Sequence, residues 1–231
     1  LPTVDYILAP VGGGGLITGV STLAKMLNPK IKVIGVEPAA APSMTMALAS
    51  GEPVTLDSAN TIADGTAVKR VGDRIFEYAK KNIDQMLTVE DDELVGAFLD
   101  MVENHKMIVE NSGLLTVAAL KQLDLKGKKA VAILSGGNMD VITMSSIVQH
   151  GLIQRDRIFS ASVLLPDKPG QLALVAQTIA DAQGNVIKLE HNQFVSTNRN
   201  AAVELRITME AYGTEHKNQI MKALEEKGFR P

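Results

Sequence analysis

The residues of this sequence most suited to holding a ligand are four consecutive glycines, Gly12, Gly13, Gly14 and Gly15. They follow a short apolar run that ends at Val11, and helical spacing of apolar residues begins directly after them. Glycine lets the backbone approach a bound group closely, and a helix N-terminus offers free N–H groups and a favourable dipole to an anion. We therefore predict that this loop binds a phosphate group. A tight turn whose glycines serve packing alone is the alternative.

The spacing of these glycines does not match two common nucleotide motifs. Counting from Gly12, the last glycine of the pattern G-x-G-x-x-G would fall on Ile17, and no Gly-Lys-Ser or Gly-Lys-Thr follows. Glu37 ends the next predicted strand, where a ribose-binding acid would stand in a nucleotide fold. A nucleotide site therefore remains an alternative.

A second polar turn, Ser135, Gly136, Gly137 and Asn138, follows a bare apolar strand. Open α/β sheets bind ligands at the carboxyl ends of their strands, and a serine hydroxyl there can form one hydrogen bond with a ring nitrogen. An ordinary strand-to-helix turn is the alternative. Two further segments are the polar loop at residues 61–65 and residues 110–113, which are typical of a helix N-cap.

An alternation of short strands and helices positions these turns. Strands are predicted at residues 4–11, 31–37, 85–89 and 129–134, and helices at 16–27, 43–50, 71–80, 91–105 and 112–123. Strands bare of polar residues, each followed by a helix, predict a parallel sheet with helices on both faces.

The pattern changes near residue 151. Strands are predicted at residues 157–165, 186–195 and 201–209, and helices at 171–183 and 214–227. This β-α-β-β-α order is ferredoxin-like with the last strand missing. We predict an α/β domain over residues 1–150, a linker over 151–157 and an α+β domain over 158–231.

Composition narrows the class of protein. The 231 residues are 45% hydrophobic and 21% charged, which is typical of one or two globular domains. A net charge of -3 gives no electrostatic footprint for nucleic acid, and no apolar run approaches the roughly 18 residues of a membrane span. The absence of cysteine excludes disulfides and zinc–thiolate sites and fits a reducing compartment, so we expect a cytoplasmic protein.

Several of these segments occur in the order and at the spacing of threonine dehydratases, a family of fold-type II pyridoxal-phosphate enzymes. The resemblance covers residues 1–150 and is carried by residues 10–16, 36–38, 61–65, 67–69, 110–113 and 134–138. The glycine loop resembles the wider fold-type II group, whereas residues 61–65 narrow the resemblance to the threonine/serine dehydratase and serine racemase branch. It implies elimination of ammonia from L-threonine, or from L-serine, with pyridoxal 5'-phosphate as cofactor. A serine dehydratase or racemase is the alternative.

The resemblance also implies roles for individual residues. The four glycines would hold the cofactor phosphate, Ser135 with Gly136 beside it would hydrogen-bond the pyridine nitrogen, and Gly65 would lie beside the ring. A neutral serine does not hold that nitrogen protonated as a carboxylate would, which favours expulsion of the β-hydroxyl.

The sequence departs from the family in several respects, two of which bear on the expected chemistry. The family's Schiff-base lysine lies in a Ser-x-Lys-x-Arg motif that precedes the glycine loop, and this sequence has no such motif. We therefore expect a fragment with no catalytic residue, inactive alone, and expect Lys69 to be a surface lysine. The divalent-metal site of serine racemase relatives would use Glu37 and the carbonyl of Ala41, but Ser43 replaces an aspartate, so only weak metal binding is expected.

Residues 158–231 resemble an ACT domain, an amino-acid-sensing module of biosynthetic enzymes, through residues 165–172 and 184–186. The resemblance implies allosteric regulation, a homo-oligomer (a dimer or tetramer) and an effector such as isoleucine or valine. The expected effector residues are Asp167, Gly170, Gln171, Leu172 and Asn185. The alternatives are a fold that only mediates dimerisation, or a non-catalytic amino-acid-binding protein on an α/β platform.

Overall fold

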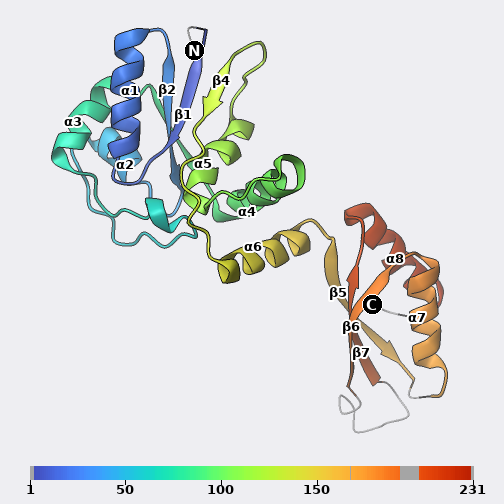
Figure 1. Cartoon of the computed structure of the whole chain (residues 1–231). Coiled ribbons are helices and arrows are strands. Elements are labelled where there is room, and N and C mark those ends of the chain that lie inside the picture. The colour runs from blue at the N-terminus through green and yellow to red at the C-terminus, as the bar shows by residue number, and fades with distance from the viewer. Residues whose placement is uncertain (1–2, 167, 193–202, 230–231) are drawn as a thin grey trace. The chain divides into compact units, whose positions relative to one another are not determined.

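A computed structural model describes residues 3–166, 168–192 and 203–229, and the chain divides into two compact units, Leu1–Val148 and Gln149–Pro231 (Figure 1). Helix α6 (Val141–Gln154) crosses the boundary and includes the first part of the predicted linker. No helix within these described ranges is both long and apolar enough to cross a bilayer.

The first unit is built on a parallel sheet of order β3-β2-β1-β4. Its strands are β1 (Tyr6–Pro10), β2 (Lys32–Pro38), β3 (Gln85–Val89) and β4 (Ala130–Ala132). Leu8 of β1 pairs with Ile34 on one side and with Ala132 on the other. Because the strands are parallel, all their carboxyl ends meet at one edge.

Helices cover both faces of this sheet, as predicted (Figure 1). One face packs against α1 (Gly15–Leu27), α2 (Ser43–Ser50) and α3 (Asp73–Asn82), and the other against α4 (Asp91–Asp100) and α5 (Asn111–Ala119). Successive strand residues point to opposite faces, so Ala9 and Val33 join the first core and Leu8 and Ile34 the second.

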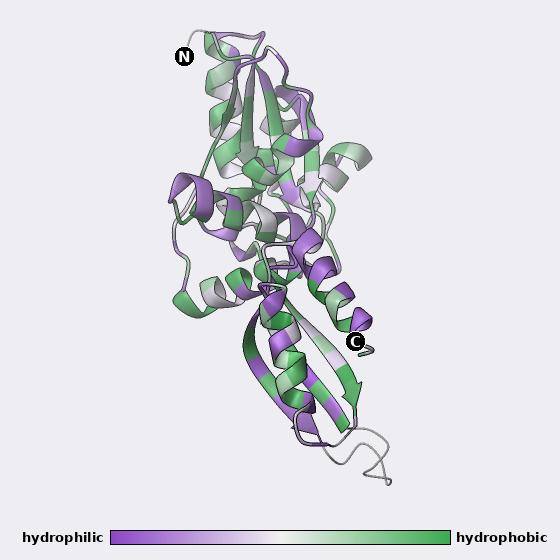
Figure 2. Cartoon of the chain, turned by 90° about the vertical axis from the view of Figure 1, so that its right-hand side faces the viewer, coloured by the Kyte–Doolittle hydropathy of each residue, from purple (hydrophilic) through white to green (hydrophobic). Residues whose placement is uncertain are grey.

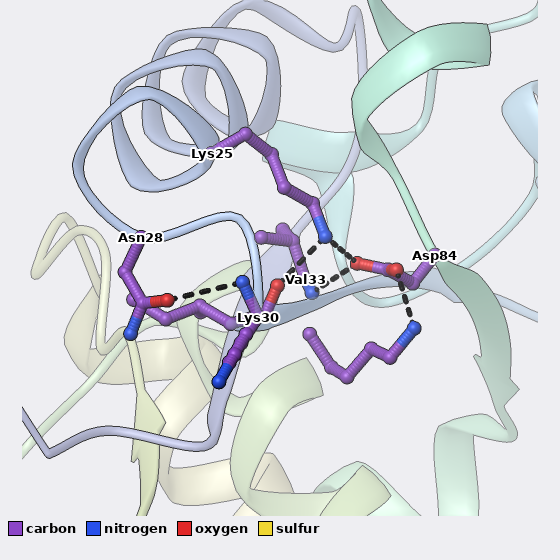
Figure 3. A network of polar contacts seen from close by, with 7 residues as sticks. Lys25, Asn28, Lys30, Val33 and Asp84 are labelled. Carbon is purple, nitrogen blue, oxygen red and sulfur yellow. Dashed lines mark hydrogen bonds and ion pairs between the residues drawn. The ribbon is translucent and has the colours of Figure 1, made fainter.

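Asp84, in the turn before β3, ties the end of α1 to the start of β2 (Figure 3). Its carboxylate accepts bonds from Lys25 Nζ at 2.6 Å, the Val33 N–H at 2.8 Å and Lys32 Nζ at 3.0 Å. Burial opposes ionisation of Asp84, but these three donors outweigh it and hold its pKa below the ordinary value. The network anchors the end of the helix whose N-terminus adjoins the glycine loop.

Three predicted elements differ in the structure. The helix predicted over residues 91–105 is α-helical only to Asp100, and a π-helix, Met101–His105, ends at Lys106 with φ 57°. The helix predicted over 112–123 ends at Ala119 and continues as a short 3-10 turn. The strand predicted over 129–134 is only three residues long. It pairs with β1 at the edge of the described sheet, and its side chains are exposed or half-buried.

The second unit has the predicted β-α-β-β-α order: β5 (Ile158–Leu165), α7 (Gln171–Asp181), β6 (Asn185–Asn192), β7 (Val203–Glu210) and α8 (Thr214–Glu226). The sheet is antiparallel with order β5-β7-β6, so β5 is an edge strand of the described sheet. In β5 and β7, buried side chains alternate with more exposed ones. Strands of this sheet carry both hydrophobic (green) and hydrophilic (purple) bands in Figure 2. Asp167 and residues 193–195 and 201–202 of the predicted strands lie outside the described residues.

Candidate functional site

The glycine loop leaves the sheet at the end of β1, where the Val11 N–H donates to the Val36 carbonyl at 2.8 Å. Gly14 has φ 83°, and a Cβ there would lie 2.6 Å from a methyl carbon of Ile75, so only glycine fits. A Cβ at Gly13 or at Gly15 would meet no protein atom within 4 Å. The outer side of the loop is therefore open to a ligand.

The N-terminus of α1 is left available to an anion. Its N-cap, Gly14, has no side chain to accept a bond, and its first turn holds no acidic residue. Helix α4, by contrast, has three acidic residues in its first turn and a capping box formed by Glu90 and Glu93. The first N–H groups of α1 lack intrahelical acceptors and lie at the positive end of the helix dipole, which suits a phosphate group.

The loop at residues 61–65 lies directly against the glycine loop. A Cβ on Gly12 would come within 2.9 Å of the Thr66 Cα and 3.3 Å of the Gly65 carbonyl oxygen. Only a residue without a side chain allows this contact, so Gly12 brings the two predicted segments together.

Two residues whose partners were not predicted from the sequence anchor this second loop. Asp91, the first residue of α4, accepts hydrogen bonds from the Thr61 hydroxyl and from the Ile62 N–H. Asn111, the first residue of α5, donates through Nδ2 to the Ile62 carbonyl at 2.9 Å. The sequence shows both only as polar residues at helix starts, because their partners are distant along the chain.

The Ser135 turn packs against the first turn of α5. A Cβ on Gly113 would collide with the Ser135 carbonyl oxygen, and one on Gly136 would collide with the Glu110 carboxylate. On its other side, α5 meets Gly65, where a Cβ would lie 2.9 Å from the Ser112 Oγ. The structure therefore places the glycine loop, Gly65, Ser135 and Gly136 around one edge of the sheet.

A buried hydroxyl without a protein partner lies beside Gly65. Ser112 is 4% exposed, and its Oγ has no hydrogen-bond partner. An unpaired buried hydroxyl is costly, and such groups in folded proteins usually have a partner. The open space beside Gly13 and Gly15, the close packing at Gly65 and the half-buried neutral Ser135 suit a phosphate-bearing aromatic ring such as pyridoxal phosphate.

Glu37 is fully buried and is engaged by the N-terminus of α2. One carboxylate oxygen accepts the Met44 N–H at 2.7 Å, and the other accepts the Thr45 N–H at 2.9 Å and the Thr45 hydroxyl at 2.7 Å. Burial raises the pKa of Glu37, and these hydrogen bonds oppose the shift in part. Glu37 therefore serves the fold whether or not it binds a ligand.

The predicted metal ligands already have local partners. The Ala41 carbonyl accepts the Ser43 N–H at 3.0 Å, and both oxygens of Glu37 are bonded to α2. In the described part of the chain no three His, Asp or Glu side chains converge on one point. Metal binding at Glu37 and Ala41 stays a prediction.

Lys69 lies at the surface, as expected, where its Nζ donates to the Asp57 carbonyl at 2.8 Å. This hydrogen bond joins two residues of the segment between α2 and α3, and no described contact links Lys69 to the glycine loop.

The predicted effector residues that the structure describes divide between the two ends of α7 (Asp167 lies outside the described residues). Gly170 is the N-cap of α7, and Gln171 and Leu172 form its first turn, whereas Asn185 begins β6 after the helix has ended. The helix has 11 residues, which corresponds to about 16 Å. A single copy of this chain therefore does not bring Asn185 to the other residues.

A parallel sheet with a glycine loop at an uncapped helix N-terminus is the scaffold of a phosphate-binding α/β protein. A family model described as pyridoxal-phosphate dependent enzyme matches residues 1–136, and the chain belongs to this family, whose cofactor is pyridoxal phosphate.

Known proteins similar to the chain include threonine- and serine-processing enzymes by name. The chain is 37% identical over 230 residues to the L-threonine ammonia-lyase of Thermotoga maritima, and the alignment covers 99% of this chain and 57% of that protein. Threonine deaminase isoform 2 from Solanum lycopersicum matches with TM-score 0.60 and 37% identity over 64% of this chain and 45% of that chain. Serine racemase from Dictyostelium discoideum matches with TM-score 0.56 and 40% identity over 61% and 46%. The chain thus spans little more than half the length of its Thermotoga relative.

Proposed function

We propose that this chain supplies the phosphate-binding and ring-nitrogen-binding part of a pyridoxal-phosphate-dependent L-threonine ammonia-lyase. The observation that carries the proposal is the meeting of the glycine loop, Gly65 and the Ser135 turn at one sheet edge, beside the unpaired Ser112 hydroxyl. Similarity to a threonine ammonia-lyase over nearly the whole chain supports threonine as the substrate and 2-oxobutanoate and ammonia as the products.

Each part of the site has a distinct task in this proposal. Backbone N–H groups at Gly13 and Gly15 bind the phosphate, and the uncapped α1 favours its negative charge. The missing side chain at Gly65 lets this loop pack closely against Ser112, so that the Gly65 backbone borders the ring. The Ser135 hydroxyl bonds the ring nitrogen without adding charge. Pyridoxal phosphate, when bound, supplies the electron-withdrawing ring for β-elimination. We assign no catalytic lysine within this chain.

A serine dehydratase or serine racemase is the second candidate. The 40% identity to the Dictyostelium serine racemase favours it, because the same cofactor contacts would serve both reactions. The products separate the candidates: 2-oxobutanoate from threonine, pyruvate from serine, or D-serine.

For the second unit we propose an ACT-like regulatory domain that binds a small amino acid and associates with a second copy. Two observations support this proposal. The described sheet leaves β5 as an edge strand, which invites pairing with another chain. Asn185 is also separated from Gly170 within one copy, so these residues can share a ligand only across two copies.

The test is an assay of the native protein, with its intact mass measured in parallel. With pyridoxal phosphate we expect 2-oxobutanoate from threonine, and no product from the 231-residue chain alone, because that chain has no Ser-x-Lys-x-Arg motif. A loaded native protein that consumes neither threonine nor serine would overturn the proposal. Product from the 231-residue chain would overturn its predicted inactivity.

A further inference from the structure

Two helices of the first unit have glutamate at the N-cap, and they use it differently. The Glu90 side chain accepts a hydrogen bond from its own helix, α4, and completes a capping box with Glu93. The Glu110 side chain makes no capping bond to its own helix, α5. It is directed instead at a neighbouring turn.

That neighbouring turn is the one that carries Ser135. Glu110 Oε2 accepts the Asn138 N–H at 3.1 Å, and the carboxylate occupies the space that a side chain on Gly136 would need. Gly136 has φ 85°, a conformation that also favours glycine. The other oxygen, Oε1, lies 3.6 Å from a Cβ position on Gly65. One carboxylate therefore lies between the two loops expected to border the ring.

Helix α5 holds the chain before Ser135 as well. The Thr116 hydroxyl lies 3.0 Å from the Ile133 carbonyl and donates to it, and Gly113 packs against the Ser135 carbonyl oxygen. Beyond Ser135, a hydrogen bond from the Asn138 N–H to the Glu110 carboxylate fixes the turn to α5. Its loss would free the segment after Ser135 while the contacts before it remain.

We propose that Glu110 is a positioning residue that fixes the Ser135 turn against α5 and Gly65, so that the Ser135 hydroxyl is held at the ring-nitrogen position. This inference deepens the proposed function, because the benefit of positioning Ser135 rests on a ring being bound there. Glu110 itself touches the turn and not the reacting atoms.

The first test measures the turn without any ligand, by amide hydrogen exchange of the 231-residue chain. We expect Glu110→Ala to speed exchange at the Asn138 amide about tenfold, and Glu110→Gln to retain most of the protection because its amide oxygen can still accept the bond. Glu90→Ala is the matched control: it removes an N-cap glutamate of the same type but leaves Asn138 unchanged. Equal exchange at Asn138 in the wild type and Glu110→Ala would overturn the proposal.

The second test links the turn to Ser135 through binding of pyridoxine 5'-phosphate, which lacks the aldehyde and cannot react with surface lysines. Glu110→Ala should weaken binding about tenfold, Glu110→Gln should restore it, and Glu110→Ala should add little in a Ser135→Ala background. Additive losses, an unrescued Gln variant, or a similar loss in Glu90→Ala would contradict positioning through Ser135. If the wild-type chain does not bind the probe, the proposed ring site fails and with it this role of Glu110, while exchange at Asn138 still reports whether the contact exists.

Discussion

At the scale of single residues, the candidate site contains groups that have no contact or hydrogen-bond partner within the described protein. Gly13 and Gly15 leave open space, and Ser112 keeps a buried hydroxyl unpaired. Ser135 is neutral, so a ring nitrogen bound there gains a hydrogen bond without a charge partner. This difference from a carboxylate governs which reaction the cofactor favours.

Replacement of Ser135 tests that argument in the native protein. Ser135→Ala should weaken cofactor binding and reduce elimination about tenfold or more, because one hydrogen bond to the ring is lost. Ser135→Asp should hold the nitrogen protonated and raise racemisation or transamination relative to elimination. The measurement is product analysis by chiral chromatography. An unchanged rate and product ratio in Ser135→Asp would show that Ser135 does not contact the ring nitrogen.

Glu37 gives a pH-dependent prediction. Burial raises its pKa in the folded protein, so the folded state favours the protonated carboxyl, and the stability this group contributes is lost as pH rises through the folded pKa. The free energy of unfolding of the wild type relative to Glu37→Gln should therefore fall as the pH rises above about 4.5, the ordinary pKa of the group. The expected change is about 1.4 kcal/mol for each unit of pKa increase. Urea unfolding at several pH values measures it, and a relative stability that rises with pH would contradict the prediction.

At the scale of elements, sequence patterns predicted most strands and helices because apolar periodicity and glycine loops are local signals. These patterns gave wrong element boundaries where tertiary contacts determine the local structure. The π-helix at Met101–His105 and the short edge strand β4 depend on packing and pairing that periodicity does not encode. The roles of Asp91 and Glu110 were missed for the same reason, because their partners lie about 30 positions away in the chain.

In the glycine loop before α1, we expect Gly14 to matter for the stability of the chain and Gly13 to matter for ligand binding. Gly14→Ala should destabilise the chain by about 1–3 kcal/mol, because its φ of 83° is left-handed and its Cβ would contact Ile75 and Met44. Gly13→Ala should change stability by less than about 0.5 kcal/mol, since its Cβ meets nothing in the protein. Chemical unfolding of both variants checks this, and a Gly13→Ala variant as unstable as Gly14→Ala would show that the loop is not open at Gly13.

At the scale of the whole molecule, we propose that the first unit binds the cofactor and the second regulates. The first unit holds every predicted cofactor residue, and the second holds the predicted effector residues at separate positions. The sequence predicted the order of elements in the second unit. It could not reveal that Asn185 and Gly170 lie at opposite ends of α7, because that follows from the path of the chain after the helix.

Complementation between variants tests whether the effector site is shared by two copies. Leu172→Trp and Asn185→Ala should each abolish isoleucine or valine binding, because every site would lack one side. An equimolar mixture should regain about a quarter of the wild-type sites, since half the dimers are mixed and each has one intact site. Calorimetry with sedimentation measures this. A monomeric chain, or a mixture with no recovered sites, would argue against a shared site.

The central claim, that the glycine loop holds the cofactor phosphate, is tested most directly by titrating the 231-residue chain with pyridoxine 5'-phosphate and following ligand fluorescence. We predict saturable binding that inorganic phosphate displaces and that Gly13→Ala weakens at least about tenfold without loss of stability, because the new methyl group would occupy the space open to the phosphate. Absence of saturable binding, or equal affinity in the wild type and Gly13→Ala, would contradict the account.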